Sequence, residues 1–494
     1  MKNNWLFTFL LSLFLVSSNE TSIAQNTDFK LSDYKNPDYV YQKLDLNFDL
    51  NNNLTINKAS SNSKTWNVSL NSGAGAAYAL FKNSEKTQVE LNSVLQAGLG
   101  SGWHGYSQNA SQNDNNSKWL SYIQDFSISG LKRFYNVQQQ FFEVNGSIGS
   151  FYNGSSNQNK SITSDGQIFE NTNRQKLQNY ELTLGLLAGS GRIEQVQDAR
   201  MAMYLLEDLE KLNRISRKAS NEDILALSRI ITQLKYKRFF DYRLRKIAEI
   251  TAIDSFLKTN GISGQADATY FTSLNDNWNY ANNPERYSGH RIFAGLETSY
   301  YFAKYSRNYT YTDTIFPDEI NRQKNAGLYL IAGYKYEKPV SLRWQNSASI
   351  KAGLGLRQAI TTNDSEGIEL SPDDFTRGFP SVNLSAEYGF GYYPNSRTWL
   401  TLNWWLLSGW DKEKRGTSKD DSEDFQSSFY VFTGPQFHAY YYLSEKLRLS
   451  LNANGEFRFD RQKYNYPVLE GNPDKSTISW WNHNIDAALT YSLF

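Results

Sequence analysis

The sequence predicts an all-β membrane protein, an antiparallel transmembrane β-barrel of about 14 strands with a small α-helical insert between strands 6 and 7. Two observations carry this prediction. Long stretches of the 494-residue chain alternate apolar and polar residues, and aromatic residues make up 15% of a chain whose mean hydropathy is negative. Many aromatic residues beside many Asn, Ser and Gly suit a barrel with aromatic girdles, an apolar outside and a polar lumen.

The alternation is clearest from Leu447 to Asp460, where apolar residues such as Leu449 and Phe457 alternate with polar ones such as Arg448. Residues 342–357 and 381–392 repeat the pattern. These runs exceed the roughly 5–6 residues of an ordinary soluble strand and match the roughly 9–11 residues of a tilted membrane strand. They therefore favour strands with lipid on one face and a polar interior on the other.

The strand count comes from both halves of the chain. Eight candidate strands follow Ser288, and six precede Gly191, near residues 40–50, 65–81, 87–100, 117–134, 139–152 and 176–190. The total is even, as in single-chain bacterial barrels, and twelve or sixteen strands stay open as alternatives. We expect tight turns at residues 338–339, 394–396 and 444–445, and long polar loops at 358–378, 411–424 and 462–477.

The region 191–288 interrupts the barrel pattern with helical periodicity. Apolar residues recur at helical spacing from Ile193 to Leu206 and from Leu227 to Leu257, and Ser220 with Asp223 forms a capping pattern. A third short helix is expected at 268–281. Counting strands from either end of the chain places this insert on the side of both termini, which we interpret as the periplasm.

The first 24 residues have the features of a signal peptide. Lys2 precedes an apolar run from Trp5 to Val16, which is shorter than the roughly 20 residues of a membrane-spanning helix. Small residues at 22–24 predict cleavage before Gln25, and the absence of Cys excludes a lipoprotein. The predicted organisation is a signal peptide at 1–24, a first barrel part at 25–190, the insert at 191–288 and a second barrel part at 289–494.

Composition also excludes several classes of function. The 51 basic and 50 acidic residues nearly cancel, which argues against a nucleic-acid partner. Zero Cys residues exclude thiolate chemistry. The 4 His residues are scattered, at His104, His290, His438 and His483. No HExxH or GxSxG motif occurs, so we expect no enzyme, cofactor or metal site.

Several segments resemble outer-membrane barrels of the Bacteroidota. The resemblance rests on the signal end Ala24-Gln25, the aromatic, Asn-rich barrel pattern, the final Phe494 and the insert segments GRIEQVQDARMAMYLLEDL and RFFDYRLRKI. A terminal Phe is similar to the general signal for barrel assembly, although Ser492 stands where such signals usually have an aromatic residue. The resemblance implies an architecture with a periplasmic helical insert, and it implies no substrate or catalytic residue.

Charged residues on the predicted inner faces are the first candidate site. The candidate lumen-lining residues are Arg343, Lys351, Arg357, Glu387, Arg448, Glu456, Arg458 and Asp460. They could line a hydrated pore whose mixed charges weakly select solutes. They could equally form a lattice of ion pairs that seals the barrel, since about 14 strands lie between filled and openly aqueous barrels.

Basic residues of the insert are the second candidate site. The candidate partner-docking residues are Arg229, Lys235, Lys237, Arg238, Arg243, Arg245 and Lys246. They could dock an acidic periplasmic protein or the carboxylates of the cell wall, or they could form an ordinary solvated helix face.

We therefore expect an integral outer-membrane barrel with both termini in the periplasm, and a porin-like channel for small polar solutes as its function. The alternative is a non-enzymatic anchor or accessory subunit whose insert docks an envelope partner. The expected surroundings are outer-membrane lipid and lipopolysaccharide, with the barrel-assembly machinery as a partner during biogenesis. Nucleic acid is not expected as a partner.

Overall fold

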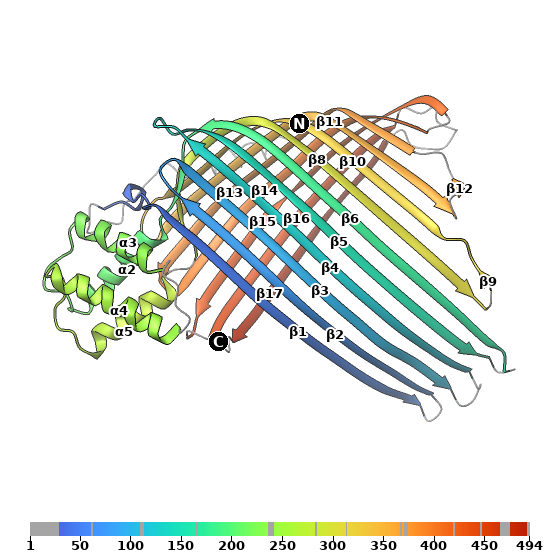
Figure 1. Ribbon diagram of the computed structural model, residues 1–494, viewed down its shortest axis with the longest axis horizontal. Helices are drawn as coiled ribbons and strands as arrows, with labels where there is room; N and C mark the ends of the chain where they lie inside the picture. Colours follow the sequence, from blue (N-terminus) through green and yellow to red (C-terminus); the bar gives the residue numbers. More distant parts are fainter. Residues whose placement is uncertain are drawn as a thin grey trace, which may run out of the picture.

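A computed structural model describes residues 29–60, 63–108, 113–163, 166–235, 242–281, 284–312, 314–365, 368–369, 374–417, 420–444, 447–464 and 475–491. The predicted signal peptide, residues 1–24, and the final Phe494 lie outside these ranges. Within them, one large curved sheet carries a small group of helices at one end of its strands (Figure 1).

In the described part of the chain, fourteen long strands of 17 to 25 residues form the sheet. They are β1 (Tyr39–Ser60), β2 (Ser63–Asn83), β3 (Thr87–Gln108), β4 (Asn113–Tyr135), β5 (Gln140–Ile162), β6 (Ile168–Ser190), β8 (Tyr287–Tyr311), β10 (Glu319–Pro339), β11 (Trp344–Ser365), β13 (Asp374–Asn395), β14 (Thr398–Thr417), β15 (Asp420–Tyr442), β16 (Leu447–Tyr464) and β17 (Lys475–Tyr491). Three short strands extend the sheet: β7 (Ile193–Gln195) and β9 (Thr314–Ile315) pair with β8, and β12 (Ile368–Glu369) pairs with β11.

Each long strand pairs antiparallel with its neighbour in the chain, and β6 pairs with β8 across the insert. Six long strands precede the insert and eight follow it, as the alternation predicts. The predicted fold class, a barrel-type antiparallel sheet of about 14 strands with a small helical insert between the sixth and seventh, is confirmed.

The sheet has one apolar and one polar face because side chains alternate along each strand. On β10, Leu328, Leu330 and Tyr334 are exposed on one face, while Tyr329 and Ile331 are more covered on the other. The polar face is the concave one. Lys351 of β11 lies 2.7 Å from Glu297 of β8 across the intervening strand β10.

The two edge strands are β1 and β17. The described residues of β1 pair with β2, and those of β17 pair with β16, with no ladder between β1 and β17 among these ranges. Both edge strands keep the alternation of the sheet interior: Leu46 and Phe48 of β1, like Ile485 and Leu489 of β17, are exposed on the apolar side.

The strands run further than the sequence pattern predicts. Residues 411–424 are expected to be a loop, but β14 continues to Thr417 and β15 begins at Asp420. Likewise, β11 reaches Ser365 and β13 starts at Asp374 within the expected loop 358–378. These loop predictions are wrong in extent. Alternation of apolar and polar residues marks only the part of a strand that faces an apolar medium. The antiparallel hydrogen bonds of the sheet continue through polar segments as well.

The tight turns, the helices and both described chain ends share one end of the sheet. β1 begins there, β17 ends there, and the turn residues 340–343, 396–397 and 443–444 lie there. The insert leaves from the end of β6 and returns at the start of β8 on that same side (Figure 1). The insert and both described chain ends therefore lie at the same end of the sheet, as strand counting predicts, while the compartment of this end stays a prediction.

In its described residues the insert has four α-helices: α2 (Gln197–Lys211), α3 (Asn221–Lys235), α4 (Tyr242–Thr259) and α5 (Ala268–Tyr280). Helix α2 is the central one, because its residues from Gln197 to Leu206 are buried around its circumference. Its apolar side chains join residues of α3, α4 and α5 in one core. Asp267 begins α5, since its side chain accepts a hydrogen bond from the Tyr270 amide at 3.0 Å. No described helix is long and apolar enough to cross a membrane.

A segment preceding β1 also belongs to the insert core. The 3-10 helix η1 (Leu31–Asp33) and its neighbours bury Phe29, Leu31 and Tyr34 among the helices. The Tyr34 hydroxyl lies 2.7 Å from the Thr232 hydroxyl of α3. Residues 29–38, here called the strap, therefore tie the insert to the first strand.

Candidate functional site: a helical cap on the mouth of the sheet

The insert contacts residues at and beside turns in both halves of the sheet. We call residues 191–286 the cap, and the contacted residues 83–85, 341–344 and 393–397 the rim. Two glycines mark where the chain leaves and re-enters the sheet. Gly191 and Gly289 both have positive φ, +95° and +124°, a conformation that favours glycine. A Cβ at Gly191 would lie 2.3 Å from the His290 carbonyl oxygen, and one at Gly289 would lie 2.1 Å from that of Arg192. The chain crosses itself closely at this point, so these positions require glycine.

Arg192 fastens the start of the cap to the β2–β3 turn. Its guanidinium donates to the Asn83 side chain at 2.9 Å and to the carbonyls of Ser84 and Glu85 at 2.9 and 2.8 Å. Glu194, at 2.5 Å, balances its charge. This end of the cap is thus held by charge-assisted hydrogen bonds to backbone oxygens.

Arg286 fastens the other end of the cap to the β10–β11 turn. Its guanidinium donates to the carbonyls of Leu342 at 2.6 Å, Ser341 at 2.9 Å and Trp344 at 2.7 Å, and to the Gln345 side chain at 3.1 Å. Burial lowers the pKa of Arg286 to about 9. The side chain stays cationic at neutral pH, and the carbonyl cage replaces the water it loses.

Arg200 and Tyr204 of α2 form the centre of the contact with the β13–β14 side of the rim. The Tyr204 hydroxyl donates to the Tyr393 carbonyl at 2.6 Å. The Tyr393 ring lies 4.9 Å from the Arg286 guanidinium and 5.5 Å from that of Arg200, within the range of cation–π contacts. Arg200 also donates to the Ala281 carbonyl at 2.7 Å. Burial lowers the pKa of Arg200 and raises that of Tyr204. One tyrosine ring therefore joins two buried cations of the cap.

Two ion pairs between cap and rim lie beside the contact of Arg200 and Tyr204 with Tyr393. Arg343 of the β10–β11 turn lies 2.8 Å from Glu207 of α2. Arg397 of the β13–β14 turn donates to Asp276 of α5 at 3.1 Å, and its guanidinium lies over the Tyr280 ring. These contacts extend the cap across a wide part of the rim.

A polar cavity of about 190 Å³ lies on the concave face where the cap meets the sheet. Glu285 and Arg286 border it from the cap side, and Glu337, Ser347 and Asn403 border it from the strands. Within the described ranges, no cluster of three or more His, Asp or Glu side chains could hold a metal ion. The cavity therefore offers hydrogen-bonding groups for water or a small polar solute at the base of the concave face.

Seven of the eight candidate lumen-lining residues lie on strands, on the concave polar face. Lys351 pairs with Glu297, Arg357 pairs with Glu413, and Arg458 pairs with Asp460. The Arg458 and Arg448 guanidinium groups lie over aromatic rings, those of Phe432 and Tyr440. Glu387 lies on β13 opposite Ser349, and Glu456 lies on β16 opposite Asn482.

Arg343 is the exception among these candidates. It precedes β11, in the turn, and its side chain reaches the cap instead of the concave face. The sequence pattern continues smoothly through Leu342 and Trp344, so it could not show that the chain turns there. Arg343 is a rim residue, and its placement in the lumen is a correction.

The seven candidate docking residues do not form one uniform surface in the described region. Lys235 pairs with Asp198 of α2, and Arg245 lies 2.8 Å from Glu249 on its own helix. Arg229 is exposed on α3, and Lys246 is half-buried on α4. Lys237 and Arg238 lie outside the described residues, as does the side chain of Arg243. Two of these cations thus stabilise the cap internally, and partner docking by the others stays a prediction.

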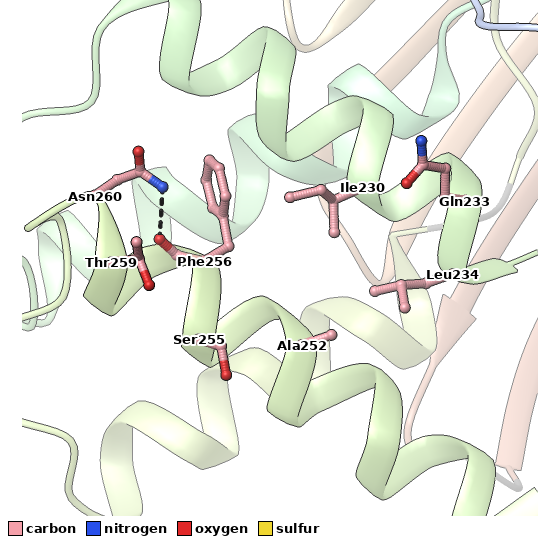
Figure 2. Close-up of a pocket in the computed structure, with 8 residues that line it drawn as sticks. All are labelled: Ile230, Gln233, Leu234, Ala252, Ser255, Phe256, Thr259 and Asn260. Carbon is pink, nitrogen blue, oxygen red and sulfur yellow. Dashed lines mark hydrogen bonds between the residues drawn. The ribbon is translucent and has the colours of Figure 1, made fainter.

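An open groove of about 450 Å³ lies between α3 and α4 on the cap. Figure 2 shows Ile230 and Leu234 of α3 facing Ala252 and Phe256 of α4, with Asn260 donating to the Phe256 carbonyl at 2.8 Å. Apolar side chains and the polar side chains of Gln233, Ser255 and Thr259 line this groove together.

Sequence reasoning did not identify the residues of the cap–rim contact. Arg200 stands in an apolar helical repeat, and Arg286 stands in a polar segment before β8. One signal was available: Arg200 lies within the run from Ala199 to Leu206, in which every other residue is apolar or aromatic, and a charge in such a run indicates a buried partner. The identity of the partner depends on how the insert folds back, and no local pattern contains that information.

Comparison with known proteins adds two structures of low similarity. No protein-family model and no curated protein matches the chain. The translocator domain of the autotransporter NalP from Neisseria meningitidis is 12% identical, with 88% of this chain and 98% of that chain covered and a TM-score of 0.24. The transport unit of the autotransporter AIDA-I from Escherichia coli is 11% identical, with 83% and 91% covered and a TM-score of 0.20.

Proposed function

We propose that this protein is an integral outer-membrane β-barrel that acts as a porin-like channel for small polar solutes. The observation that carries the proposal is the band of exposed apolar side chains on the convex face of the sheet. Large exposed apolar surfaces are rare on soluble proteins, and a sheet with an apolar outer and a polar inner face fits a lipid-embedded barrel.

The band has the height and the edges expected for a membrane. On β8 it runs from Ile292 to Tyr300, roughly nine residues, which matches a tilted membrane strand. Aromatic side chains border it near the tight turns, at Phe142, Tyr334, Trp344, Tyr392 and Tyr441, and again further along the strands, at Tyr300, Trp410 and Phe429. Such belts are typical of the two membrane–water interfaces.

The concave face supports an aqueous lumen. One of its ion pairs stays open to solvent: the side chains of Lys351 and Glu297 remain 39% and 31% exposed although they contact each other, whereas those of Arg133 and Glu143 are 6% exposed each. In lipid, the free edges of β1 and β17 would leave backbone groups unsatisfied, so we propose that these two strands pair with each other in the membrane. The polar face then encloses the path for solutes.

The second candidate function is an anchor whose cap docks an envelope partner in the periplasm. The groove between α3 and α4 favours it, because it is an uncovered apolar surface on the part of the chain that faces water. An anchor needs no continuous lumen, so solute flux distinguishes the two functions.

Two measurements test the channel proposal. The purified protein should migrate faster in a detergent gel before boiling than after it, since a closed barrel stays folded in detergent. Proteoliposomes containing it should swell in isotonic pentose or hexose solution, at a rate that falls as the solute becomes larger. Equal mobility before and after boiling would contradict the barrel, and a folded barrel that gives no swelling under any condition would favour the anchor.

A further inference from the structure

We infer that the cap is a gate of the lumen, held closed by a latch of Arg200, Tyr204 and Arg286 against the rim at Leu342 and Tyr393. This inference rests on the proposed channel function and specifies its regulation. It concerns a movable contact between the helical insert and the sheet.

The cap extends across the end of the sheet. Arg192 contacts the β2–β3 turn, and Arg397 of the β13–β14 turn contacts α5. Beyond that turn, Tyr280 of α5 packs against Tyr442 at the end of β15, with ring centroids 5.3 Å apart. The helices lie at one end of the strands (Figure 1). If β1 and β17 pair and close the sheet, helices held at these points would lie over the mouth of its polar interior.

The contacts between cap and rim differ in kind from those inside the cap. Inside, apolar side chains of α2, α3, α4 and α5 form one buried core. Toward the rim, the described contacts are mainly hydrogen bonds, ion pairs and arginine–ring contacts, and Leu342 is the rim side chain that joins the core. A polar contact can be exchanged for water at small net free energy, whereas an apolar core cannot. The cap can therefore separate from the rim as one folded body.

The covalent connections suit such a movement. The cap joins the sheet at Gly191 and before Gly289, and the strap enters β1 at Tyr39. The strap is held to the cap through Tyr34, while Asn36 and Tyr39 both donate to Gln195, at 2.9 and 2.7 Å. The strap therefore stays with the cap, and these connections lie on the β1 and β6–β8 side. The latch at Tyr393 and the Arg397 contact lie on the later strands, so opening is expected on that side.

A reversible crosslink tests the gate on the full chain. Because the protein has no Cys, Asp276→Cys with Arg397→Cys supplies the only pair of thiols, and a short bis-methanethiosulfonate reagent joins cap to rim. The control pair is Arg214→Cys with Asp267→Cys, whose native side chains form an ion pair at 2.8 Å within the cap. In planar bilayers, crosslinking the first pair should abolish channel openings, and reductant should restore them. The control pair should conduct equally with and without the reagent.

Substitutions in the latch test the same gate by weakening its closed state, whereas the crosslink fixes that state. Tyr204→Phe removes one hydrogen bond, and Arg286→Ala removes the carbonyl-bound cation, so open probability should rise several-fold in the first and about tenfold or more in the second. Heat-modifiable migration verifies that each variant is folded, and the conservative Tyr204→Phe remains informative if Arg286→Ala misfolds. A crosslinked cap that conducts as the uncrosslinked one does would overturn the gate and leave the channel intact. No current from the native protein or either latch variant would refute the channel, and the gate with it.

Discussion

Apolar side chains are buried in the cap, whereas side chains of the same types are exposed on the convex face of the sheet. In the cap, Leu205 and Leu227 are 0% exposed and surrounded by other helices. In the sheet, Leu330 and Ile292 are 59% and 58% exposed, although they lie on interior strands. This difference is expected if the chain meets two media, water around the cap and, as the proposed barrel requires, lipid around the sheet.

The largest effect is expected in the cap core. Leu227→Ala removes a fully buried side chain from α3, and such a cavity costs about 2–5 kcal/mol. The cap should become protease-sensitive at much lower urea in reconstituted protein, while the boiled and unboiled gel bands of the barrel stay unchanged. Leu212→Ala, at a 40% exposed position after α2, is the matched control and should have little effect. Equal sensitivity of the two variants would mean that the cap core does not stabilise the cap.

A slightly smaller effect is expected from a charge on the convex face. Leu330→Arg places a cation near the middle of the apolar band on β10, which costs about 2–4 kcal/mol if that position faces the bilayer midplane. Urea titration of the protein in phospholipid vesicles measures the change. Ser349→Arg places the same side chain on the concave face of β11 and should fold nearly as the native protein does. If Ser349→Arg were the more damaging of the two, the assignment of faces to lipid and lumen would be reversed.

The smallest effect is expected from acid, and only in the cap. A hydrogen bond from Arg217 lowers the pKa of Asp223, and one from Arg214 lowers that of Asp267. A carboxylate with a lowered pKa stabilises the fold above its unfolded pKa, roughly 3.9 for Asp, and the contribution disappears as pH falls through the folded value. Both ion pairs lie near the surface of the cap, with side-chain exposures of 12% for Asp223 and 30% for Asp267, so screening by solvent keeps the contribution small.

Far-UV circular dichroism between pH 7 and pH 3 checks this dependence through the helical signal of the cap. The helical signal should weaken toward the acid end, and Asp267→Asn should remove part of that dependence. A variant with an unchanged acid profile would show that the Arg214 pair does not contribute.

Strand alternation predicted much of the fold. The faces of β16 and β17 are those expected, with Leu449 and Ile485 outward and Arg448 and Asp486 inward, because a period of two leaves only one choice of register for the apolar face. The short helix at α5 was also expected from the spacing of Phe271, Leu274 and Trp278. These are local properties, since each depends on neighbours within one strand or one helical turn.

The candidate site was predicted less well. The inner-face charges were found, but their partners, such as Glu413 for Arg357 and Glu297 for Lys351, come from strands that are not sequence neighbours. The cap–rim latch was not found at all, because Arg200 and Tyr393 are separated by nearly two hundred residues and meet only after the insert folds back.

The order of residues alone settles which faces of the strands are apolar and that a helical segment interrupts them. Each of these follows from a periodicity that any stretch of about ten residues displays. Only the folded chain decides how far the strands continue beyond the apolar band, that Arg343 belongs to the rim, and that two arginines of the cap converge on Tyr393. Those features depend on contacts between segments that are far apart in the chain. Burying an arginine costs free energy, and hydrogen bonds to the carbonyl groups of a distant turn offset that cost.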